Sequence, residues 1–473
     1  MSVEARKHHT KKSKHQKKDK GGSADSGFAG RAPAPPPAPL PSCGWNPTQL
    51  NIFDILSFGA KGDGVRDDSE ALLAAWKAAC KVPGATLEIP SEFKFLIKPI
   101  TLQGPCMPHL VLQIDGTLLA PPEVGSWPKS SLFQWLNFKW VQNFTIQGTG
   151  AVDGQGPQWW TASSLYYTPK KLKHIPDLKP TALRFYGSYN VTVRDIKIIN
   201  SPQCHLKFDN SAGVKVDNIK ISSPENSPNT DGIHLQNTRD VEIQHSNIGC
   251  GGYDWSAINW VDGAWHVRIA EQKLSGDDCV SIQTGCSNIH IHHINCGPGH
   301  GISLGSLGKD KSVGCVFDIL VEKISVQNTL AGVRIKTWQG GIGSVKNVSF
   351  SNIQVSDVKV PIIIDQYYCD KHFCKNQTGA VAISGVKYDQ IIGTYSVQPI
   401  YLACSNDIPC TDVDLIDIQL KPSPKFRGFH QALCWNSYGK SKAPLVPSSI
   451  DYCLRRDSGS IMKRVARSHE HVC

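Results

Sequence analysis

The amino-acid sequence predicts an all-β fold, a right-handed parallel β-helix with a short N-terminal capping helix. Two apolar patterns alternate along the chain, the step between them is constant in three early repeats, and helical patterns do not intervene. Short strands of this kind bury their inward side chains only by stacking on neighbouring turns, which describes a solenoid. The Leu/Asn signature of leucine-rich repeats is missing, and 41 Gly and 30 Pro against three Met favour a turn-rich β protein.

The first pattern is apolar at positions a, a+2, a+5 and a+7. The second is a four-residue unit with apolar second and fourth positions, as in ALRF, HLKF, GIHL, CVSI, GISL, GVRI and PIII. Alternation this short predicts strands with one buried face. The second pattern precedes the first by nine residues in three early repeats. The first pattern starts at Val191, Val214, Ile289, Ile319 and Val348, with a weaker copy at Val241; the second starts at Ala182, His205, Gly232, Cys279, Gly301, Gly332 and Pro361.

One helix is expected at residues 67–80 (DDSEALLAAWKAAC), where acidic residues begin a stretch with apolar residues at helical spacing. We expect this helix to cap the open end of the solenoid. The predicted organisation is a disordered basic and Pro-rich arm at 1–45, the β-helix at 46–455 and a tail at 456–473.

Positive charge is concentrated at the N-terminus. Residues 1–20 carry eight Lys or Arg and two acidic residues, out of a net charge of +10 for the chain. Three explanations remain open: a solvated tail, a nucleic-acid patch, or an anchor to an anionic matrix. No nucleic-acid motif follows, so we expect no nucleic-acid partner. Residues 32–41 (APAPPPAPLP) resemble a stiff polyproline spacer.

Sixteen cysteines without a zinc-type CxxC pair favour disulfides and an oxidising compartment. The pairs Cys369–Cys374 and Cys404–Cys410 are close enough in sequence to close locally. Four N-glycosylation sequons also fit a secreted, cell-wall protein, although no signal peptide is visible, and we expect a leader to have been lost. No run of eighteen apolar residues exists, so we expect no membrane partner. The sequons are at Asn143, Asn190, Asn347 and Asn376.

The repeat spacing is broken once. The step from Val241 to Cys279 is 38 residues, whereas the other steps from the first pattern to the second are 12 to 18. The excess at 252–276 does not follow the strand pattern, and it is either a lateral loop or a foreign insertion.

Polar residues fall in register beside the second pattern. Successive turns of a β-helix stack about 4.8 Å apart, so residues in one column become near neighbours. Single Asp residues before strands are usually turn residues, and an Asp pair is often a solvated turn or a calcium ligand. Three acids beside two cations instead form an arrangement that tunes pKa values, which favours a functional site. Its members are Asp231, Asp277, Asp278, His300, Arg334 and Lys336.

Four segments then resemble the signature blocks of the polygalacturonases of glycoside hydrolase family 28, with the plant members nearest in character. They are SPNTDGIHL (227–235), GDDCVSI (276–282), CGPGHGISLGSLG (296–308) and RIKTW (334–338), all in order. The similarity covers roughly residues 50–455. It implies hydrolysis of α-1,4-galacturonosidic bonds in pectin (homogalacturonan) with inversion, by a monomer that needs no metal or organic cofactor.

The resemblance also implies roles for individual residues. Asp278 would be the general acid, and Asp231 and Asp277 would activate the attacking water. His300 would support the proton network, and Cys279 would pair with Cys296. The residues expected to bind substrate are Arg334 and Lys336, with Asn229 and Tyr368 at similar positions.

The sequence departs from the family at the excess segment. Removing residues 252–276 would restore NIGCGDDCVSI, so the segment could be translated intron sequence. Two other functions therefore stay open. One is a catalytically impaired pectin-binding homologue, whose site the segment perturbs; the other is a pectate lyase, which would need calcium and an Arg base.

Overall fold

A computed structural model describes residues 51–127, 134–164, 179–224, 227–251, 276–369, 377–425, 427–456 and 473. Residues 50–473 form one compact unit. The arm predicted at 1–45 and nearly all of the segment at 252–276 and of the tail at 456–473 lie outside the described residues. Those domain boundaries stay predictions.

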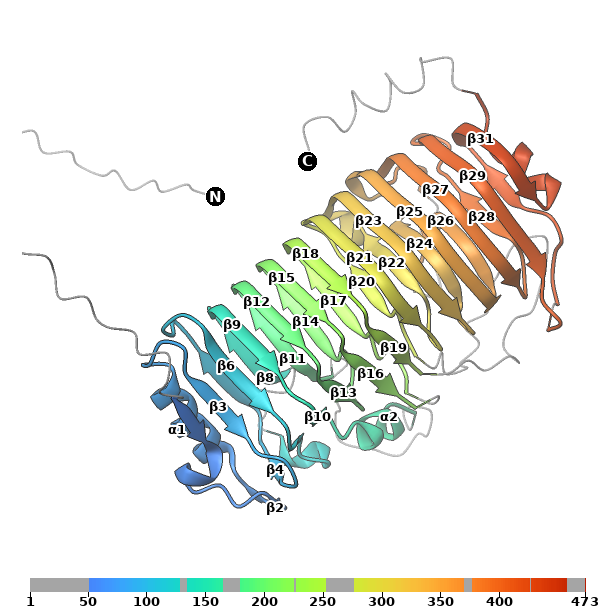
Figure 1. The fold of residues 1–473 in the computed structure, drawn as a ribbon. Helices are drawn as coiled ribbons and strands as arrows, with labels where there is room; N and C mark the ends of the chain where they lie inside the picture. The colour runs from blue at the N-terminus through green and yellow to red at the C-terminus, as the bar shows by residue number, and fades with distance from the viewer. Residues whose placement is uncertain are drawn as a thin grey trace, which may run out of the picture. The chain divides into compact units, whose positions relative to one another are not determined.

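The described strands form three parallel ladders in which each strand pairs with the strand one coil before and one coil after (Figure 1). This is the parallel β-helix that the two apolar patterns predict. The first ladder consists of β1 (Ile52–Asp54), β3 (Thr86–Ile89), β6 (Leu110–Ile114), β9 (Gln142–Gln147), β12 (Tyr189–Arg194), β15 (Ala212–Asp217), β18 (Arg239–Gln244), β21 (Cys286–Cys296), β23 (Val313–Gln327), β25 (Ile342–Val358), β27 (Ala382–Tyr395), β29 (Cys410–Pro422) and β31 (Ser437–Val446).

The second ladder is built from shorter strands and joins the first in β21. Strand β21 pairs with β18 along its first half and with β19 at Asn295 and Cys296, so one long strand continues both ladders. The second ladder consists of β2 (Asp63–Asp67), β4 (Lys94–Leu96), β7 (Thr117–Leu119), β10 (Ala151–Asp153), β13 (Lys197–Ile199), β16 (Lys220–Ser223) and β19 (Asn247–Cys250).

The third ladder, an eleven-stranded sheet in the described residues, takes in every copy of the second sequence pattern. Aromatic rings stack inside this ladder from coil to coil. The centre of the Phe185 ring lies 4.9 Å from that of Phe138 and 5.0 Å from that of Phe208. Its strands are β5 (Ile100–Gln103), β8 (Gln134–Lys139), β11 (Thr181–Tyr186), β14 (Leu206–Asp209), β17 (Ile233–Gln236), β20 (Val280–Ile282), β22 (Ile302–Leu307), β24 (Ala331–Trp338), β26 (Val360–Tyr368), β28 (Ile400–Ala403) and β30 (Leu433–Trp435).

The first sequence pattern proves to be a bend rather than one flat strand. Its a and a+2 positions lie on the first ladder, and a+7 lies on the second or on the bent continuation of the same strand. The residue at a+4 has a positive φ in every copy, between 49° and 61°, and so turns the chain between the two faces. These corner residues are Asp195, Asn218, His245, His293, Lys323 and Asn352.

The helix expected at 67–80 is present as α1 (Ser69–Ala79), with Leu72 and Trp76 buried. It lies at the end of the solenoid where the first strands are (Figure 1), and its capping role stays a prediction. The Asp68 carboxylate accepts hydrogen bonds from the backbone N–H groups of Lys61 and Gly62 and so holds the preceding glycine-rich turn. A second helix, α2, spans Pro157–Ser164.

Disulfides fix several coils. Cys279–Cys296, which the family resemblance implies, is formed, and so is Cys404–Cys410, which was expected from closeness in sequence. Cys369 is also disulfide-bonded, and its expected partner Cys374 lies outside the described residues. The other described pairs are Cys80–Cys106, Cys315–Cys473 and Cys434–Cys453.

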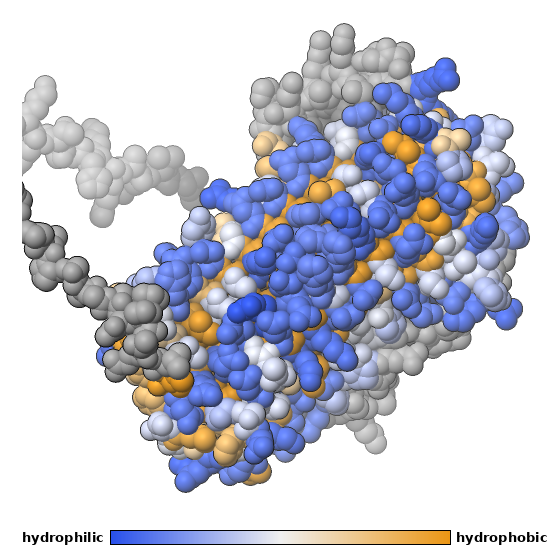
Figure 2. Space-filling model, viewed as in Figure 1, coloured by the Kyte–Doolittle hydropathy of each residue, from blue (hydrophilic) through white to orange (hydrophobic). Residues whose placement is uncertain are grey.

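The outward side chains of the coils are largely hydrophilic on the face shown in Figure 2, where they gather over the middle of the stacked strands. Within the part of the chain that the structure describes, none of the helices has the length and apolar character needed to cross a membrane.

Candidate active site

Three predicted site residues form one column because the third ladder keeps its register. Ile233 of β17 pairs with Val280 of β20, which pairs with Ile302 of β22. Asp231, Asp278 and His300 each stand two residues before those positions, so they lie on successive coils. Backbone hydrogen bonds fix the step, from Gly232 N–H to the Asp278 carbonyl oxygen at 2.9 Å and from the His300 N–H to the carbonyl oxygen of Asp277 at 2.8 Å.

Asp278 lies at the centre of a buried ionic cluster. Its Oδ1 accepts hydrogen bonds from Ser303 Oγ at 2.7 Å and from an Arg334 terminal nitrogen at 2.8 Å. Its Oδ2 lies 3.2 Å from Lys336 Nζ. Asp278 is 1% exposed, Arg334 8% and Lys336 7%, so water screens these contacts little. Arg334 Nε also donates to Ser303 Oγ at 3.0 Å, which closes a ring of contacts.

Asp277 faces His300. Its Oδ1 lies 3.2 Å from His300 Nδ1 and also accepts the Asp278 backbone N–H at 2.9 Å. Burial tends to raise the pKa of Asp277. The hydrogen bond from His300 and the positive charges of His300, Lys336 and Arg334 outweigh it and hold this pKa well below its usual range. Asp277 is therefore ionised throughout the ordinary pH range.

Asp231 behaves in the opposite way. Its Oδ2 lies 3.0 Å from His234 Nδ1. Burial raises the pKa of Asp231 well above the ordinary value, and the negative charges of Asp277 and Asp278 raise it further. Burial also lowers the pKa of His234 to about 3, so this imidazole is neutral and can donate from Nδ1. The carboxyl groups of Asp231 and Asp277 thus have pKa values shifted in opposite directions, which is typical of acid–base sites.

The cations stand on β24, one coil beyond His300, and an aromatic residue of the next coil covers Lys336. Lys336 Nζ lies 5.5 Å from the centre of the Tyr368 ring, which meets the Trp338 ring edge-on at 5.8 Å. Asp365 pairs with Lys336 across the sheet. Burial raises the pKa of Asp365 to about 6.

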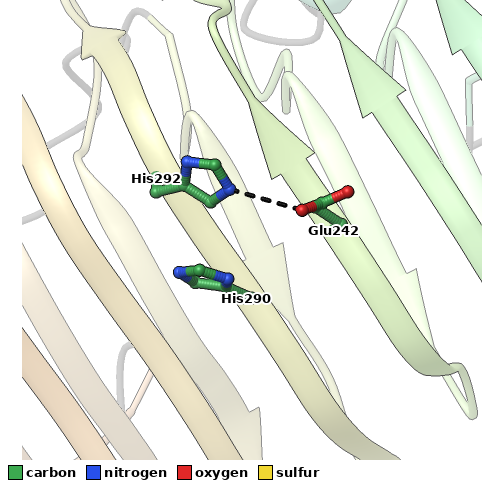
Figure 3. A group of neighbouring side chains, drawn as sticks. All are labelled: Glu242, His290 and His292. Carbon is green, nitrogen blue, oxygen red and sulfur yellow. Dashed lines mark ion pairs between the residues drawn. The ribbon is translucent and has the colours of Figure 1, made fainter.

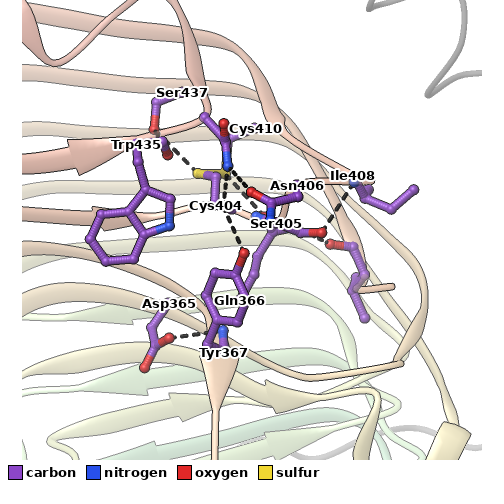
Figure 4. Close-up of a disulfide and its surroundings, with 12 residues drawn as sticks. Asp365, Gln366, Tyr367, Cys404, Ser405, Asn406, Ile408, Cys410, Trp435 and Ser437 are labelled. Carbon is purple, nitrogen blue, oxygen red and sulfur yellow. Dashed lines mark hydrogen bonds between the residues drawn. A yellow bond between two sulfur atoms is a disulfide. The ribbon is translucent and has the colours of Figure 1, made fainter. Parts of the chain in front are cut away.

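The surroundings of Asp365 are held by the Cys404–Cys410 disulfide (Figure 4). The Asp365 carboxylate accepts the Tyr367 backbone N–H at 2.9 Å, and the Tyr367 hydroxyl donates to the Cys404 carbonyl oxygen at 3.4 Å. This end of the third ladder is therefore braced by a covalent link next to the cationic residues.

Asn229, the remaining predicted contact, is exposed in the turn before Asp231 and has a φ of 54°. Its neighbour Pro228 forms an isolated parallel bridge with Gly276, so Asn229 lies close to the chain that leads into Asp277. The structure places it beside the column, and substrate contact by Asn229 stays a prediction.

The excess segment leaves and rejoins the coil at one point. The Cys250 carbonyl oxygen accepts the Asp277 N–H at 3.1 Å. A methyl group built on Gly251 would lie 2.7 Å from the Gly276 Cα, so the two glycines that flank residues 252–275 are in contact. Asp277 and Asp278 consequently keep their place beside Asp231, with the segment present in the chain.

Two residues of the site were not predicted from the sequence. Ser303 links Asp278 to Arg334, and His234 contacts Asp231. Both occupy the third position of the second pattern, the same outward position that Arg334 holds in GVRI. The register of the repeat therefore places Ser303 and His234 next to the site. However, Ser and His are common at outward strand positions and do not by themselves indicate function.

The group of Asp277, Asp278 and His300 is unsuited to binding a metal ion. Ligand atoms of Asp277, Asp278 and His300 lie within 4.8 Å of one another, a spacing that a cation could bridge. However, Arg334 and Lys336 already contact the two Asp278 oxygens. A metal ion there would face two fixed positive charges in a buried site, which is electrostatically unfavourable.

The comparisons with known proteins agree with this geometry. The sequence profile of glycosyl hydrolases family 28 matches residues 80–260 and 261–435, and its break falls inside the excess segment. Polygalacturonase of Cryptomeria japonica is 37% identical over 425 residues, covering 89% of this chain and 76% of that protein. Polygalacturonase-2 of Solanum lycopersicum is 36% identical over 418 residues, covering 86% and 83%.

Solved structures show the same fold. The endo-xylogalacturonan hydrolase of Aspergillus tubingensis superposes with a TM-score of 0.63 at 21% identity, over 83% of this chain and 98% of that one. The profile match, the relatives and the right-handed β-helix point in one direction. The chain is a glycoside hydrolase and belongs to family 28.

Proposed function

We propose that the chain hydrolyses α-1,4-galacturonosidic bonds in polygalacturonate, the backbone of pectin, with inversion of configuration. The observation that carries the proposal is the buried cluster in which Arg334 and Lys336 contact Asp278. These cations stand two coils beyond Asp277 and three coils beyond Asp231. The related proteins of Cryptomeria and tomato are named polygalacturonases, which supports the same substrate.

The cations account for an acidic sugar. Arg presents a planar fork that matches a carboxylate, and Lys presents a compact point charge. A galacturonate carboxylate bound at Arg334 and Lys336 would supply two acceptor oxygens in place of the two that the Asp278 carboxylate supplies in the free protein. Tyr368 and Trp338 lie beside Lys336 and would give the sugar ring an aromatic neighbour.

Asp278 acts as the general acid in this proposal, while Asp231 and Asp277 activate the water. Inverting hydrolases separate acid and base by about 6.5–9.5 Å so that a water fits between them. Asp277, which is ionised, is ready to accept a proton, and His300 holds its orientation.

Substrate binding would also redistribute the proton of the site. In the free protein the pKa of Asp231 is raised, while Asp278 forms ion pairs with Arg334 and Lys336 and accepts a hydrogen bond from Ser303. When a substrate carboxylate takes over Arg334 and Lys336, Asp278 loses its positive partners and becomes the better proton acceptor. Transfer of a proton from Asp231 to Asp278 would make Asp231 an ionised base and Asp278 a protonated acid. The total number of protons in the site would not change.

We also infer that the protein works outside the cell, in the pectin of the cell wall, as a monomer without a nucleic-acid partner. The disulfides of the described residues are typical of proteins that fold in an oxidising compartment. The basic residues before position 21 would then hold the enzyme to anionic pectin, and its retention on polygalacturonate should fall as salt is added.

The test is incubation of the full chain with polygalacturonate in EDTA, followed by proton NMR of the new chain ends. We expect reducing ends that appear first in the β configuration. Binding without release of reducing ends would mean an impaired pectin-binding homologue. Cleavage that occurs only when calcium replaces EDTA, and that gives unsaturated ends, would mean a lyase. Either result contradicts the proposal.

A further inference from the structure

A second group of titratable side chains lies on the first ladder, away from the acids just described. Glu242 of β18 pairs in register with His290 of β21, and His292 stands two residues further along the same strand (Figure 3). Residues i and i+2 of a strand share one face, so both imidazoles project outward with the carboxylate of the neighbouring coil.

The spacing of these three side chains suits a metal ion. Ligand atoms of Glu242, His290 and His292 all lie within 4.8 Å of one another. His292 Nε2 and Glu242 Oε1 are 3.5 Å apart. Two ligands that are each about 2.0–2.1 Å from a tetrahedral zinc ion lie about 3.4 Å from each other, so this pair already has the required separation.

The far nitrogen of each imidazole is also held, as is usual for metal-binding histidines. His290 Nε2 lies 3.1 Å from Glu322 Oε1, so a donating Nε2 leaves Nδ1 to bind a cation. His292 Nδ1 lies 2.8 Å from His293 Nδ1, so Nε2, the atom that faces Glu242, is left to act as the ligand. Both histidines are thereby oriented from outside the cluster.

We propose that Glu242, His290 and His292 form a site for a divalent transition-metal ion, with zinc as the best fit and water as the fourth ligand. Two histidines and a glutamate are an established zinc ligand set. The side chains of Glu242 and His290 are 42% and 38% exposed, so an ion can enter from solvent.

One cation competes with the metal. Lys215 Nζ lies 3.3 Å from Glu242 Oε2, on the oxygen that does not face His292. The pair is about half exposed and therefore weak. Removing Lys215 should tighten zinc binding, whereas a merely structural histidine cluster would show no such response.

A bound ion would join two coils beside the active site. Strand β21, which carries both histidines, ends at Cys296, whose disulfide partner Cys279 follows Asp278 directly. An ion bound to the native protein stabilises it by mass action, so the melting temperature should rise with zinc concentration.

The test is isothermal titration calorimetry of the full chain with ZnCl₂. The chain has 17 His, so the number of bound ions must be compared between variants. We expect His290→Ala/His292→Ala to bind one ion fewer than the parent. His430→Ala, a control at an exposed histidine in the connection between β29 and β30, should bind the same number. Glu322→Gln should weaken the site about 10- to 100-fold, and Lys215→Ala should strengthen it.

A second measurement, made on the parent protein, does not depend on how the variants fold. Crystals soaked in ZnCl₂ should give an anomalous zinc peak between Glu242, His290 and His292. An equal number of ions in parent and double variant would overturn the proposal, and so would a peak pattern that leaves this group empty. Neither readout depends on pectin hydrolysis.

Discussion

The same solenoid register builds two charged groups with opposite physical character. On the third ladder, Asp278 is 1% exposed and makes contacts of 2.7–3.2 Å with Ser303, Arg334 and Lys336. On the first ladder, the ion pairs of Glu242 with Lys215 and His292 are 3.3 and 3.5 Å long, and Glu242 is 42% exposed.

Burial, more than composition, therefore decides how strongly a column of charged side chains interacts. Exposed ion pairs contribute about 0–1 kcal/mol, because water screens them. Buried charges interact strongly and cannot be left unpaired, so the third-ladder cluster responds to any change of partner.

Asp278→Asn should lower kcat on polygalacturonate by about 10²- to 10⁴-fold, the usual contribution of a general acid. The amide keeps an oxygen for Ser303 but cannot supply the proton. Release of reducing ends measures the effect, with Asp389→Asn, from an exposed pair with Lys387, as the matched control. An Asp278→Asn enzyme with near-parental kcat would remove the acid role.

Lys336→Ala should weaken substrate binding by roughly 10- to 100-fold, from about 1.5–3 kcal/mol for a hydrogen bond to a charged group. The expected change is mainly in KM. Lys387→Ala, on the exposed face, should leave both kinetic constants alone. Unchanged affinity in the Lys336 variant would count against carboxylate recognition.

Ser303→Ala should reduce kcat by roughly tenfold, because Asp278 and Arg334 both lose a hydrogen-bond partner. Ser303→Thr retains the hydroxyl and should recover most of the activity. A serine that only filled space would give the reverse order, with Ala tolerated and Thr not.

Asp231→Asn should raise the melting temperature in a pH-dependent way. The native pKa of Asp231 lies above the unfolded value of 3.8, so its stabilising contribution is present below that pH and lost as pH rises through the native pKa. The variant stays neutral at all pH values. The melting temperature of the variant should therefore exceed that of the parent by little at about pH 4 and by more at about pH 8. A calorimetric difference in melting temperature that does not change with pH would contradict the raised pKa.

Deleting residues 252–275 should have the smallest effect on folding. Gly251 and Gly276 would become neighbours, and the Cys250 carbonyl already accepts the Asp277 N–H at 3.1 Å, as in a β-turn. Positive φ values of 99° and 83° suit glycine at both central positions. We expect the shortened chain to keep its melting temperature and pectin hydrolysis; loss of either would show that the segment supports the fold or the site.

Much of this architecture could be predicted from the sequence because strand alternation and coil spacing are local. The column of Asp231, Asp278 and His300 follows from that register alone. The bend at Asp195 and its counterparts was not predicted, because a single left-handed residue leaves the apolar pattern unchanged.

Side-chain pairing was harder to foresee than position. Arg334 and Lys336 were expected to meet the substrate, and in the free protein they contact Asp278, a choice that depends on side-chain conformation. The group of Glu242, His290 and His292 was missed because it lies on the first apolar pattern, whereas only the polar residues beside the second pattern were aligned from coil to coil. The roles of Asn229 and of the excess segment stay predictions.

The central claim is that the substrate carboxylate competes with Asp278 for Arg334 and Lys336. NMR titration with galacturonate, which contains no glycosidic bond to cleave, tests it directly. We expect galacturonate to bind Asp278→Asn more tightly than the parent, because the internal competitor has lost its charge. Uncharged galactose should show no such gain. Equal or weaker galacturonate binding by the variant would contradict it.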